Sequence, residues 1–336
     1  MQGRIDTIID CLSAPFLYVA DPVRRVYWVY LLSALAIAGA VFLYRRRAPD
    51  RASIAGFIAY VAPRQIYGHR SARIDYWFFY VNAVLGGLIL APLVAAPAAA
   101  AFVAHMLGGP APAPPAPGPF WSIGLTIATF LAMDCALYVG HYLQHKVPLL
   151  WEFHKVHHSA EVLTPITAFR VHPVDDLLTL SLTALFTGVA QGLFHVTVGT
   201  GIADIHVLGV NVLLFAWYIF GFHVRHSHVW LAYPAWLSHI LVSPAQHQIH
   251  HSNSPRHFDK NMGFIFAFWD AIVGTLYVPK AREDLTYGLY GEEPGQFGSV
   301  PALYIRPFLN LWAMRSRGAG ADRIAPPSAA ARRPSA

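Results

Sequence analysis

The sequence predicts an all-α membrane protein in which a transmembrane helical bundle supports a cytoplasmic, histidine-rich cap. Three observations predict this fold class. The chain is 55% hydrophobic with a mean hydropathy of +0.42, and only 12% of its residues are charged, about half of the ~25% typical of soluble domains. Long uncharged apolar stretches separate the polar loops. Histidines gather in three short motifs that have helical spacing.

Five apolar stretches are the candidate membrane spans. Each approaches or exceeds the ~20 helical residues that a ~30 Å hydrocarbon core requires. They are residues 26–44, 76–104, 120–140, 177–197 and 202–222. The second is longer than one span needs and contains prolines, so it can tilt or break. The last two, which flank a VGTG turn, could instead form a hairpin that enters the membrane without both helices crossing it.

The basic residues orient the chain. Seven arginines lie between the first two spans, whereas the three arginines before the first span are offset by acids; the seven are Arg45, Arg46, Arg47, Arg51, Arg64, Arg70 and Arg73. The positive-inside rule therefore places residues 45–75 in the cytoplasm. Counting spans forward puts the uncharged Pro/Ala loop 108–119 outside, and residues 141–176 and those after about 222 inside. We expect a multi-pass protein of a bacterial inner membrane. Because topology explains the net charge of +6, no nucleic-acid partner is expected.

The histidine motifs are HYLQH (141–145), HKVHH (154–158) and HQIHH (247–251), and all three fall on the predicted cytoplasmic side. On a helix, positions i, i+3 and i+4 share a face, so the imidazoles of one motif should converge on a single point. A solvated helix face with a chance histidine pair could explain one motif. Eight histidines in three such motifs instead indicate a metal site, because imidazole is the commonest protein ligand of several transition metals.

The number of imidazoles indicates two metal ions. Eight exceed the four ligands of a structural zinc site, and they suit two metals that each keep an open position. Nitrogen ligands favour iron, zinc or copper over magnesium or calcium, and open positions on paired iron would permit oxygen chemistry. The predicted cap is therefore a di-metal cap. Cys11 and Cys135 are the only cysteines, too few for an iron–sulfur cluster.

The order and spacing of these motifs resemble the fatty acid hydroxylase/sterol desaturase superfamily of integral-membrane di-iron enzymes. HYLQH, eight residues, HKVHH and a distant HQIHH form the framework of the resemblance. HHSAEVLTPITAFRVHPVDDL, with Asp175 at its acidic position, is similar to a further element of the family. RHSHVWL and FDKNMGFIFAFWDAIVGTLY are similar to two more. The resemblance covers roughly residues 120–280.

The resemblance implies a set of metal ligands, which are His141, His145, His154, His157, His158, His226, His247, His250 and His251. His228 stands where relatives have Asn or an acid, which leaves open whether it is a tenth ligand or orients one. Met262 replaces the usual Tyr. His172 is expected to orient a ligand imidazole. Asp134, seven residues before His141, is either a functional acid or part of a helix–helix hydrogen bond.

The resemblance also implies the chemistry, which is hydroxylation or desaturation of a membrane lipid by two iron ions with O2 as co-substrate. Electrons are expected from a separate donor of ferredoxin, cytochrome or flavoprotein type. The substrate class stays open among an acyl chain, a sterol or hopanoid, an amino lipid and a carotenoid. The alternatives are an acyl-lipid desaturase, whose first two motifs usually lie further apart, and a non-catalytic haem electron carrier, which needs isolated histidines on facing spans.

Three regions are expected along the chain. Residues 1–119 form an N-terminal region with two transmembrane helices and the Pro/Ala loop. Residues 120–280 form the hydroxylase-like catalytic domain, and residues 281–336 form a tail that is partly disordered. Two apolar stretches, 229–242 and 264–277, are too short to span. They are expected to lie at the membrane surface or to pack over the metal site.

Overall fold

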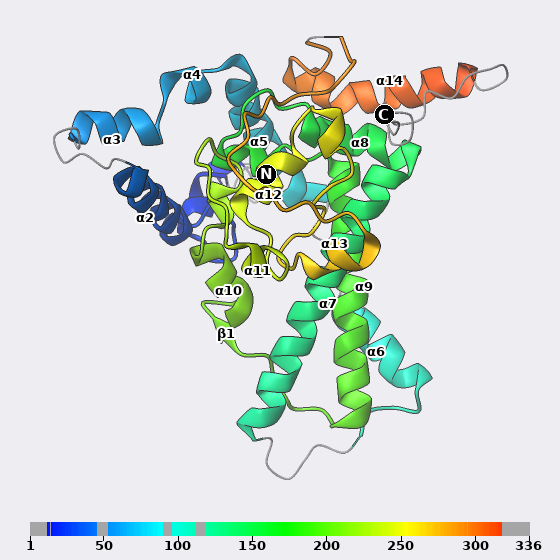
Figure 1. The fold of residues 1–336 in the computed structure, drawn as a ribbon. Coiled ribbons are helices and arrows are strands. Elements are labelled where there is room, and N and C mark those ends of the chain that lie inside the picture. The colour runs from blue at the N-terminus through cyan, green and yellow to red at the C-terminus, as the bar shows by residue number, and fades with distance from the viewer. Residues whose placement is uncertain are drawn as a thin grey trace, which may run out of the picture. The chain divides into compact units, whose positions relative to one another are not determined.

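The computed structural model describes residues 12–13, 15–45, 53–89, 96–111, 118–293 and 295–317, and these are mostly helical (Figure 1). The α-helices are α2 (Trp28–Arg45), α3 (Ile54–Val61), α4 (Arg64–Tyr67), α5 (Arg70–Ile89), α6 (Ala96–Met106), α7 (Pro119–Lys146), α8 (Pro148–His158), α9 (Pro173–Thr197), α10 (Val212–Ile219), α11 (Ala235–Ser238), α12 (Pro244–His250), α13 (Phe268–Val273) and α14 (Val300–Arg317). The 3₁₀ helices are η1 (Tyr18–Ala20), η4 (Pro165–Phe169), η5 (Phe222–Val224) and η6 (Pro255–His257). One small antiparallel hairpin pairs β1 (His206–Val207) with β2 (Val210–Asn211).

These elements form two compact units, each assembled from three separate segments of the chain. Unit 1 comprises Met1–Ser33, Asn82–Gly140 and Asp176–Phe222. Unit 2 comprises Ala34–Val81, His141–Asp175 and His223–Ala336. The boundary within α7 falls between Gly140 and His141, so every histidine of the three motifs belongs to unit 2.

In unit 1, α7 and α9 lie side by side, and small residues allow the close approach (Figure 1). A Cβ placed at Gly140 of α7 would lie 3.3 Å from Leu182 Cδ1 of α9. A Cβ at Gly192 of α9 would lie 2.8 Å from the carbonyl oxygen of Ala100 in α6. Since real Cβ atoms do not approach backbone this closely, glycine is required where α6 crosses α9.

Polar contacts fasten the β1–β2 hairpin to α7 within unit 1. Thr129 Oγ1 donates to Asp204 Oδ2 at 2.6 Å, and Thr126 Oγ1 accepts from the Ile205 backbone N–H at 2.8 Å. Asn211 Nδ2 donates to the Thr126 carbonyl at 3.2 Å. Hydroxyls on a helix can bond groups outside it while also bonding the preceding turn, so α7 supplies polar anchors within an otherwise apolar surface.

Local sequence signals explain where the two histidine-bearing helices of unit 2 begin. α8 has Val147 as its N-cap and Pro148 in its first turn, a position that proline tolerates because its missing N–H would be unpaired there. α12 begins with a capping box, in which Ser243 Oγ accepts from the Gln246 backbone N–H and Gln246 Oε1 accepts from the Ser243 backbone N–H. Capping satisfies backbone donors that a seven-residue helix would otherwise leave open.

Apolar packing holds α8 in unit 2. Val156 on α8 packs in a buried cluster with Phe78 of α5, with Leu303 of α14 and with Phe297, which precedes α14. A second cluster joins Ile249 and Ala245 of α12 to Trp230. Each of the two helices therefore packs one apolar face in the core of unit 2, and its histidines lie on a different face.

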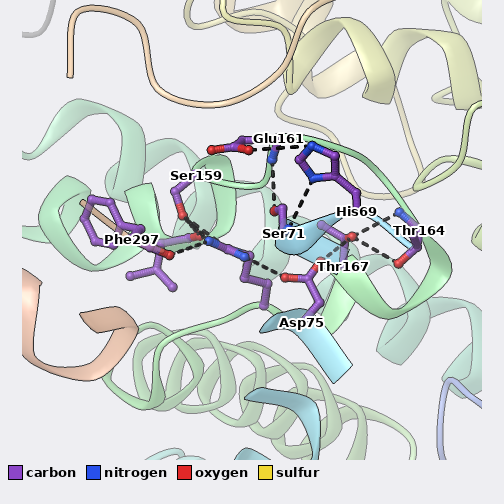
Figure 2. Close-up of polar contacts among 10 residues, drawn as sticks. His69, Ser71, Asp75, Ser159, Glu161, Thr164, Thr167 and Phe297 are labelled. Atoms are coloured by element: carbon purple, nitrogen blue, oxygen red, sulfur yellow. Dashed lines mark hydrogen bonds and ion pairs between the residues drawn. The ribbon is translucent and has the colours of Figure 1, made fainter. Parts of the chain in front are cut away.

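A buried arginine ties the end of α8 to α5 (Figure 2). Arg170 is 1% exposed, and its Nη1 donates to Asp75 Oδ1 at 2.7 Å. Its Nε donates to the Val156 carbonyl at 2.9 Å, and its Nη2 donates to Ser159 Oγ at 2.8 Å. The Thr167 hydroxyl donates to the other Asp75 oxygen at 2.7 Å. A buried charge pair of this kind is tolerated only when its remaining hydrogen-bonding capacity is also satisfied.

The structure changes the predicted set of spans. Among the described residues, two helices are long and apolar enough to cross a membrane, α7 with 28 residues and α9 with 25. They correspond to the predicted spans 120–140 and 177–197. The stretch 26–44 forms α2, which is shorter, and 76–104 is divided between α5 and α6. The prediction of a span over 202–222 is wrong, because this stretch contains the hairpin and α10, whose eight residues measure about 12 Å.

The structure also describes the two short apolar stretches, 229–242 and 264–277, and part of the predicted tail. The two short apolar stretches contain α11 and α13, and backbone hydrogen bonds join them, from the Val242 N–H to the Ile265 carbonyl and from the Ala267 N–H to the Ile240 carbonyl. Within the predicted tail, α14 is an ordered helix with Leu303 fully buried. The final residues, 318–336, lie outside the described residues.

Candidate metal centre

Nine histidines of unit 2 converge in two adjacent groups. The first contains His141, His145, His154, His158 and His250, and the second contains His157, His226, His247 and His251. Within each group, the candidate ligand atoms lie within 4.8 Å of one another. α7, α8 and α12 supply seven of these side chains, His251 is the C-cap residue of α12, and the segment after η5 supplies His226. The nine residues are those that the sequence resemblance implies.

Each three-histidine motif contributes to both groups, which corrects the prediction that one motif converges on one point. In α8, His154 and His158 belong to the first group and His157 to the second. In α12 the allocation is reversed, because His247 and His251 belong to the second group and His250 to the first. Successive residues of a helix are separated by about 100°, so His157 and His158 diverge, while residues four apart stay aligned.

Partners on Nδ1 set the tautomers of the first group. His141 Nδ1 donates to the Met262 carbonyl at 2.7 Å, and His250 Nδ1 donates to the Lys260 carbonyl at 2.8 Å. His154 Nδ1 contacts Asp175 Oδ2 at 2.8 Å. A carbonyl can only accept a hydrogen bond, so Nδ1 of His141 and of His250 carries the proton. Their Nε2 atoms therefore present lone pairs, the form that a metal ligand needs.

The segment 259–262 orients three histidines of the first group. Its backbone supplies the two carbonyl acceptors, and the Asp259 carboxylate lies 3.7 Å from His145 Nδ1. Asp259 also pairs with Lys146 at 2.6 Å. Asp259 and Asn261 have φ values of 58° and 55°, a left-handed conformation that Asn and Asp adopt more readily than most residues.

Buried contacts hold this unusual backbone in place. Asp270 accepts hydrogen bonds from the backbone N–H groups of Met262 and Gly263, both at 2.8 Å. Asn261 donates from Nδ2 to the Gln246 carbonyl at 3.1 Å and accepts at Oδ1 from the Tyr277 N–H at 2.7 Å. Strained backbone persists only where its surroundings over-determine it, so the segment is a rigid support for the imidazoles.

The residues fit a bound cation, on two observations. The Nε2 atoms of His145, His154, His158 and His250 are buried and have no hydrogen-bond partner within the described part of the chain. In the second group, the Nε2 atoms of His226, His247 and His251 approach one another at 3.0 to 3.2 Å. Nitrogens that bind one metal at about 2.0–2.1 Å lie at about such separations. Both groups therefore have the donor arrangement of metal sites.

Burial favours the neutral form of five of these imidazoles. Desolvation lowers the pKa of His157, His158, His247 and His251 well below the ordinary value, and neighbouring imidazoles lower it further. Desolvation likewise lowers the pKa of His250 to about 3. A neutral imidazole is the ligating form, so no proton has to leave these side chains before a metal binds.

Three further candidates from the sequence, His228, His172 and Asp134, lie outside both groups. His228 Nε2 donates to the Tyr60 carbonyl at 2.6 Å, and His228 is in neither group. His172 uses both ring nitrogens on backbone, since Nε2 donates to the Tyr304 carbonyl and Nδ1 accepts from the Val174 N–H. Neither of these hydrogen bonds reaches a candidate ligand imidazole, whereas Asp175 contacts that of His154. Asp134 is fully buried in unit 1 and in neither group, so its role stays a prediction.

Sequence reasoning did not assign functions to the residues that orient the ligands. Asp175 was visible only as the acid that follows the Arg-x-His-Pro element, and Asp259 only as part of FDKNMG. Gln144, one residue before His145, bonds the Asp175 carboxylate through Nε2. A carboxylate near histidine motifs is the signal that could have indicated such a role. The backbone carbonyls of Lys260 and Met262 accept hydrogen bonds from two histidines, and no pattern of side chains predicts this role.

Asp175→Asn is expected to weaken metal binding by about 10–100-fold, the usual effect of losing a group that orients a metal ligand. Asparagine keeps the size of the side chain but removes the negative charge beside His154 Nδ1. Titration of the metal-depleted protein with iron or cobalt measures the change. Asp284→Asn, at an exposed position, is the matched control and should bind as the unmodified protein does. Equal affinity of both variants would contradict the orienting role.

Comparison with known proteins identifies the family of this region. Residues 126–275 match the family model described as fatty acid hydroxylase. This region is similar to the fatty acid hydroxylase family. The fatty acid hydroxylase region contains all nine histidines of the two groups and lies within the catalytic domain predicted over 120–280.

Curated relatives of the fatty acid hydroxylase region act on different lipids. An ornithine lipid hydroxylase from Rhizobium tropici is 28% identical over 174 residues, covering 51% of this chain and 45% of that protein. An alkylglycerol monooxygenase from Danio rerio is 28% identical over 171 residues, covering 48% and 32%. A cholesterol 25-hydroxylase from Homo sapiens is 31% identical over 153 residues, covering 44% and 48%. The chain thus spans less than half the length of these relatives, and no solved structure matches it.

Proposed function

We propose that this chain is a membrane-bound, non-haem di-iron oxygenase that hydroxylates an aliphatic position of a lipid. The two adjacent all-histidine groups carry the proposal, because five and four nitrogen donors suit one ion each. Iron bound there would supply the activation of O2 that cleavage of an unactivated C–H bond requires, since no side chain can perform that step.

The chain's own residues prepare and protect this site. Asp175 and the carbonyls of Lys260 and Met262 keep the Nε2 lone pairs directed inward. Trp151 covers one side, with ring centroids 5.1 Å from His145 and 5.4 Å from His158. Buried surroundings exclude water, which strengthens electrostatic interactions and limits side reactions of an oxidising site.

A lipid substrate is supported by the relatives and by the apolar character of the chain. An ornithine lipid hydroxylase, an alkylglycerol monooxygenase and a cholesterol 25-hydroxylase are among the similar proteins, and two helices have the length and composition of membrane spans. We further propose that a separate ferredoxin, cytochrome or flavoprotein supplies the two electrons of each turnover. A bis-histidine haem carrier would need a facing pair of histidines, and unit 2 instead presents nine in two groups.

Lipid mass spectrometry tests the reaction. A strain that lacks the gene should lose one lipid class carrying an additional oxygen atom, and reintroducing the gene should restore it. Purified protein supplied with O2 and a reducing system should form the same product. Loss of a product with two fewer hydrogens would instead assign desaturation. An unchanged lipid profile together with an altered soluble metabolite would refute a lipid substrate.

Labelling of introduced cysteines tests the proposed orientation. In a background without Cys11 and Cys135, Ala281→Cys at an exposed position of unit 2 should react with an impermeant maleimide only after the cells are permeabilised. Ala113→Cys, in the Pro/Ala loop outside the described residues, should react in intact cells. The positive-inside rule is the physical reason. The opposite pattern would place the histidine groups outside, away from cytoplasmic reductants.

A further inference from the structure

α14 presents an apolar stripe that faces away from the core of unit 2. Ile305 and Phe308 are each 53% exposed, Leu309 is 47% exposed and Trp312 is 72% exposed. These positions follow the i, i+3, i+4, i+7 pattern, so the side chains form one continuous stripe along the helix. Contiguous exposed apolar surface of this kind marks a surface that binds a partner or a membrane.

The opposite face of α14 is firmly attached to unit 2, so the exposed stripe is not a displaced core face. Leu303 is fully buried, and the Tyr304 ring packs 4.8 Å from that of Phe78. Asn310 Nδ2 donates to Glu152 Oε2 on α8 at 2.8 Å. Figure 1 shows α14 running beside α8. One face of α14 therefore packs against unit 2, and the opposite face, which carries the apolar stripe, is exposed.

Positive charge borders the apolar stripe on both sides. Arg306 lies about 110° from the centre of the stripe around the helix axis, and Arg315 about 70° on the other side. Both side chains are exposed, and residues 300–317 contain no acid. An apolar stripe with flanking arginines is the pattern of a helix lying in the plane of a membrane interface, where arginines extend to the headgroups.

The surroundings of α14 extend the apolar surface towards the end of a candidate span. Val147, Pro148 and Leu149, which follow directly after α7, line a shallow groove with Leu311, Trp312 and Met314, and Arg315 stands at this groove. Leu149 is 56% exposed. α7 continues as one helix from the predicted span 120–140 to Lys146, so residues 147–149 begin about 10 Å beyond the predicted end of that span.

We propose that α14 lies flat in the membrane interface and binds anionic phospholipid, with its apolar stripe among the acyl chains and Arg306 and Arg315 on the phosphates. The stripe contains no acceptor or acidic group, whereas surfaces that dock proteins carry many hydrogen bonds. Phosphate complements the two arginines, and acyl chains complement the stripe. The inference rests on the membrane location within the proposed function and is independent of catalysis.

An environment-sensitive label tests the position of α14. The full chain, without its native cysteines, carries Phe308→Cys labelled with a nitrobenzoxadiazole dye and is reconstituted in phosphatidylcholine/phosphatidylglycerol nanodiscs. Phospholipids brominated on their acyl chains should quench this label strongly. The same label at Ala281→Cys, exposed on unit 2, should not be quenched. Absence of quenching at position 308 would overturn the proposal, as would cross-linking of that position to a second chain or to a soluble acidic protein.

Lipid selectivity tests the role of the arginines. Native mass spectrometry of protein extracted from mixed nanodiscs should show preferential retention of phosphatidylglycerol over phosphatidylcholine. R306Q/R315Q should lower that preference by about 5–25-fold, since each basic side chain near an anionic surface contributes about five-fold. K280Q/R282Q removes two exposed charges elsewhere on unit 2 and should leave the preference unchanged. An unaltered preference in R306Q/R315Q would refute anionic lipid binding, while lipid hydroxylation and metal content report separately on the proposed function.

Discussion

His250→Ala and His157→Ala are each expected to abolish oxygenase activity and to lower bound metal from about two ions per chain to about one. His250 belongs to the first histidine group and His157 to the second, so under the proposed function each variant removes one nitrogen donor from a different ion. Losing a residue that merely orients a ligand costs about 10–100-fold, and loss of the ligand itself should exceed that. Elemental analysis of purified protein, together with product formation, measures both effects.

The two variants also distinguish a two-ion site from a single ion shared by nine histidines. With two ions, each variant should retain the metal of the other group. His206→Ala, in the exposed part of β1, is the control and should keep both metal and activity. Full activity in the two ligand variants would refute the metal centre. Loss of all metal in either one would show that the groups are filled as a unit.

Arg170→Met is expected to destabilise the protein by about 3–5 kcal/mol, the typical effect of removing one partner from a buried ion pair. Arg170 is 1% exposed and Asp75 is also 1% exposed, so the remaining carboxylate would be left uncompensated away from water. Figure 2 shows Asp75, Thr167 and Ser159 directed towards this network. Denaturant unfolding in detergent, followed by tryptophan fluorescence, measures the loss of unfolding free energy.

A double-mutant cycle tests whether the pair itself is responsible. Arg170→Met with Asp75→Leu should be less destabilised than the sum of the single variants, because apolar side chains of similar size can replace a buried pair at small cost. The matched control is Arg24→Met, since Arg24 pairs with Asp21 at 3.3 Å with side chains 49% and 42% exposed. Surface pairs contribute about 0–1 kcal/mol. Equal effects of Arg170→Met and Arg24→Met would contradict the buried role.

Arg170→Met should also weaken metal binding at the histidine groups. Arg170 donates to the carbonyl of Val156, the residue immediately before His157, and to Ser159, which caps the end of α8. Loosening this end would move His157 and His158, which belong to different groups. We therefore expect Arg170→Met to lower metal content even under conditions where the chain remains folded.

The sequence alone predicted which histidines come together as candidate ligands. Helical spacing within each motif depends only on local backbone geometry, and the resemblance added His226, which the structure places in the second group. Spans 120–140 and 177–197 followed from composition and length, and both became long helices. These features are local, so a short window of residues contains the information for them.

Tertiary structure decided how the ligands are shared and supported. Whether His157 joins His154 or His226 depends on the angle at which α8 meets α12, which no local pattern encodes. The carbonyls that orient His141 and His250 are backbone atoms, which every residue possesses, so side-chain identity does not reveal them.

Residues 202–222 have the composition of a span. They fold as a hairpin and a short helix, with Asp204 and Asn211 bonded to the threonines of α7. Composition reports how apolar a segment is, whereas long-range hydrogen bonds determine the path that its backbone takes.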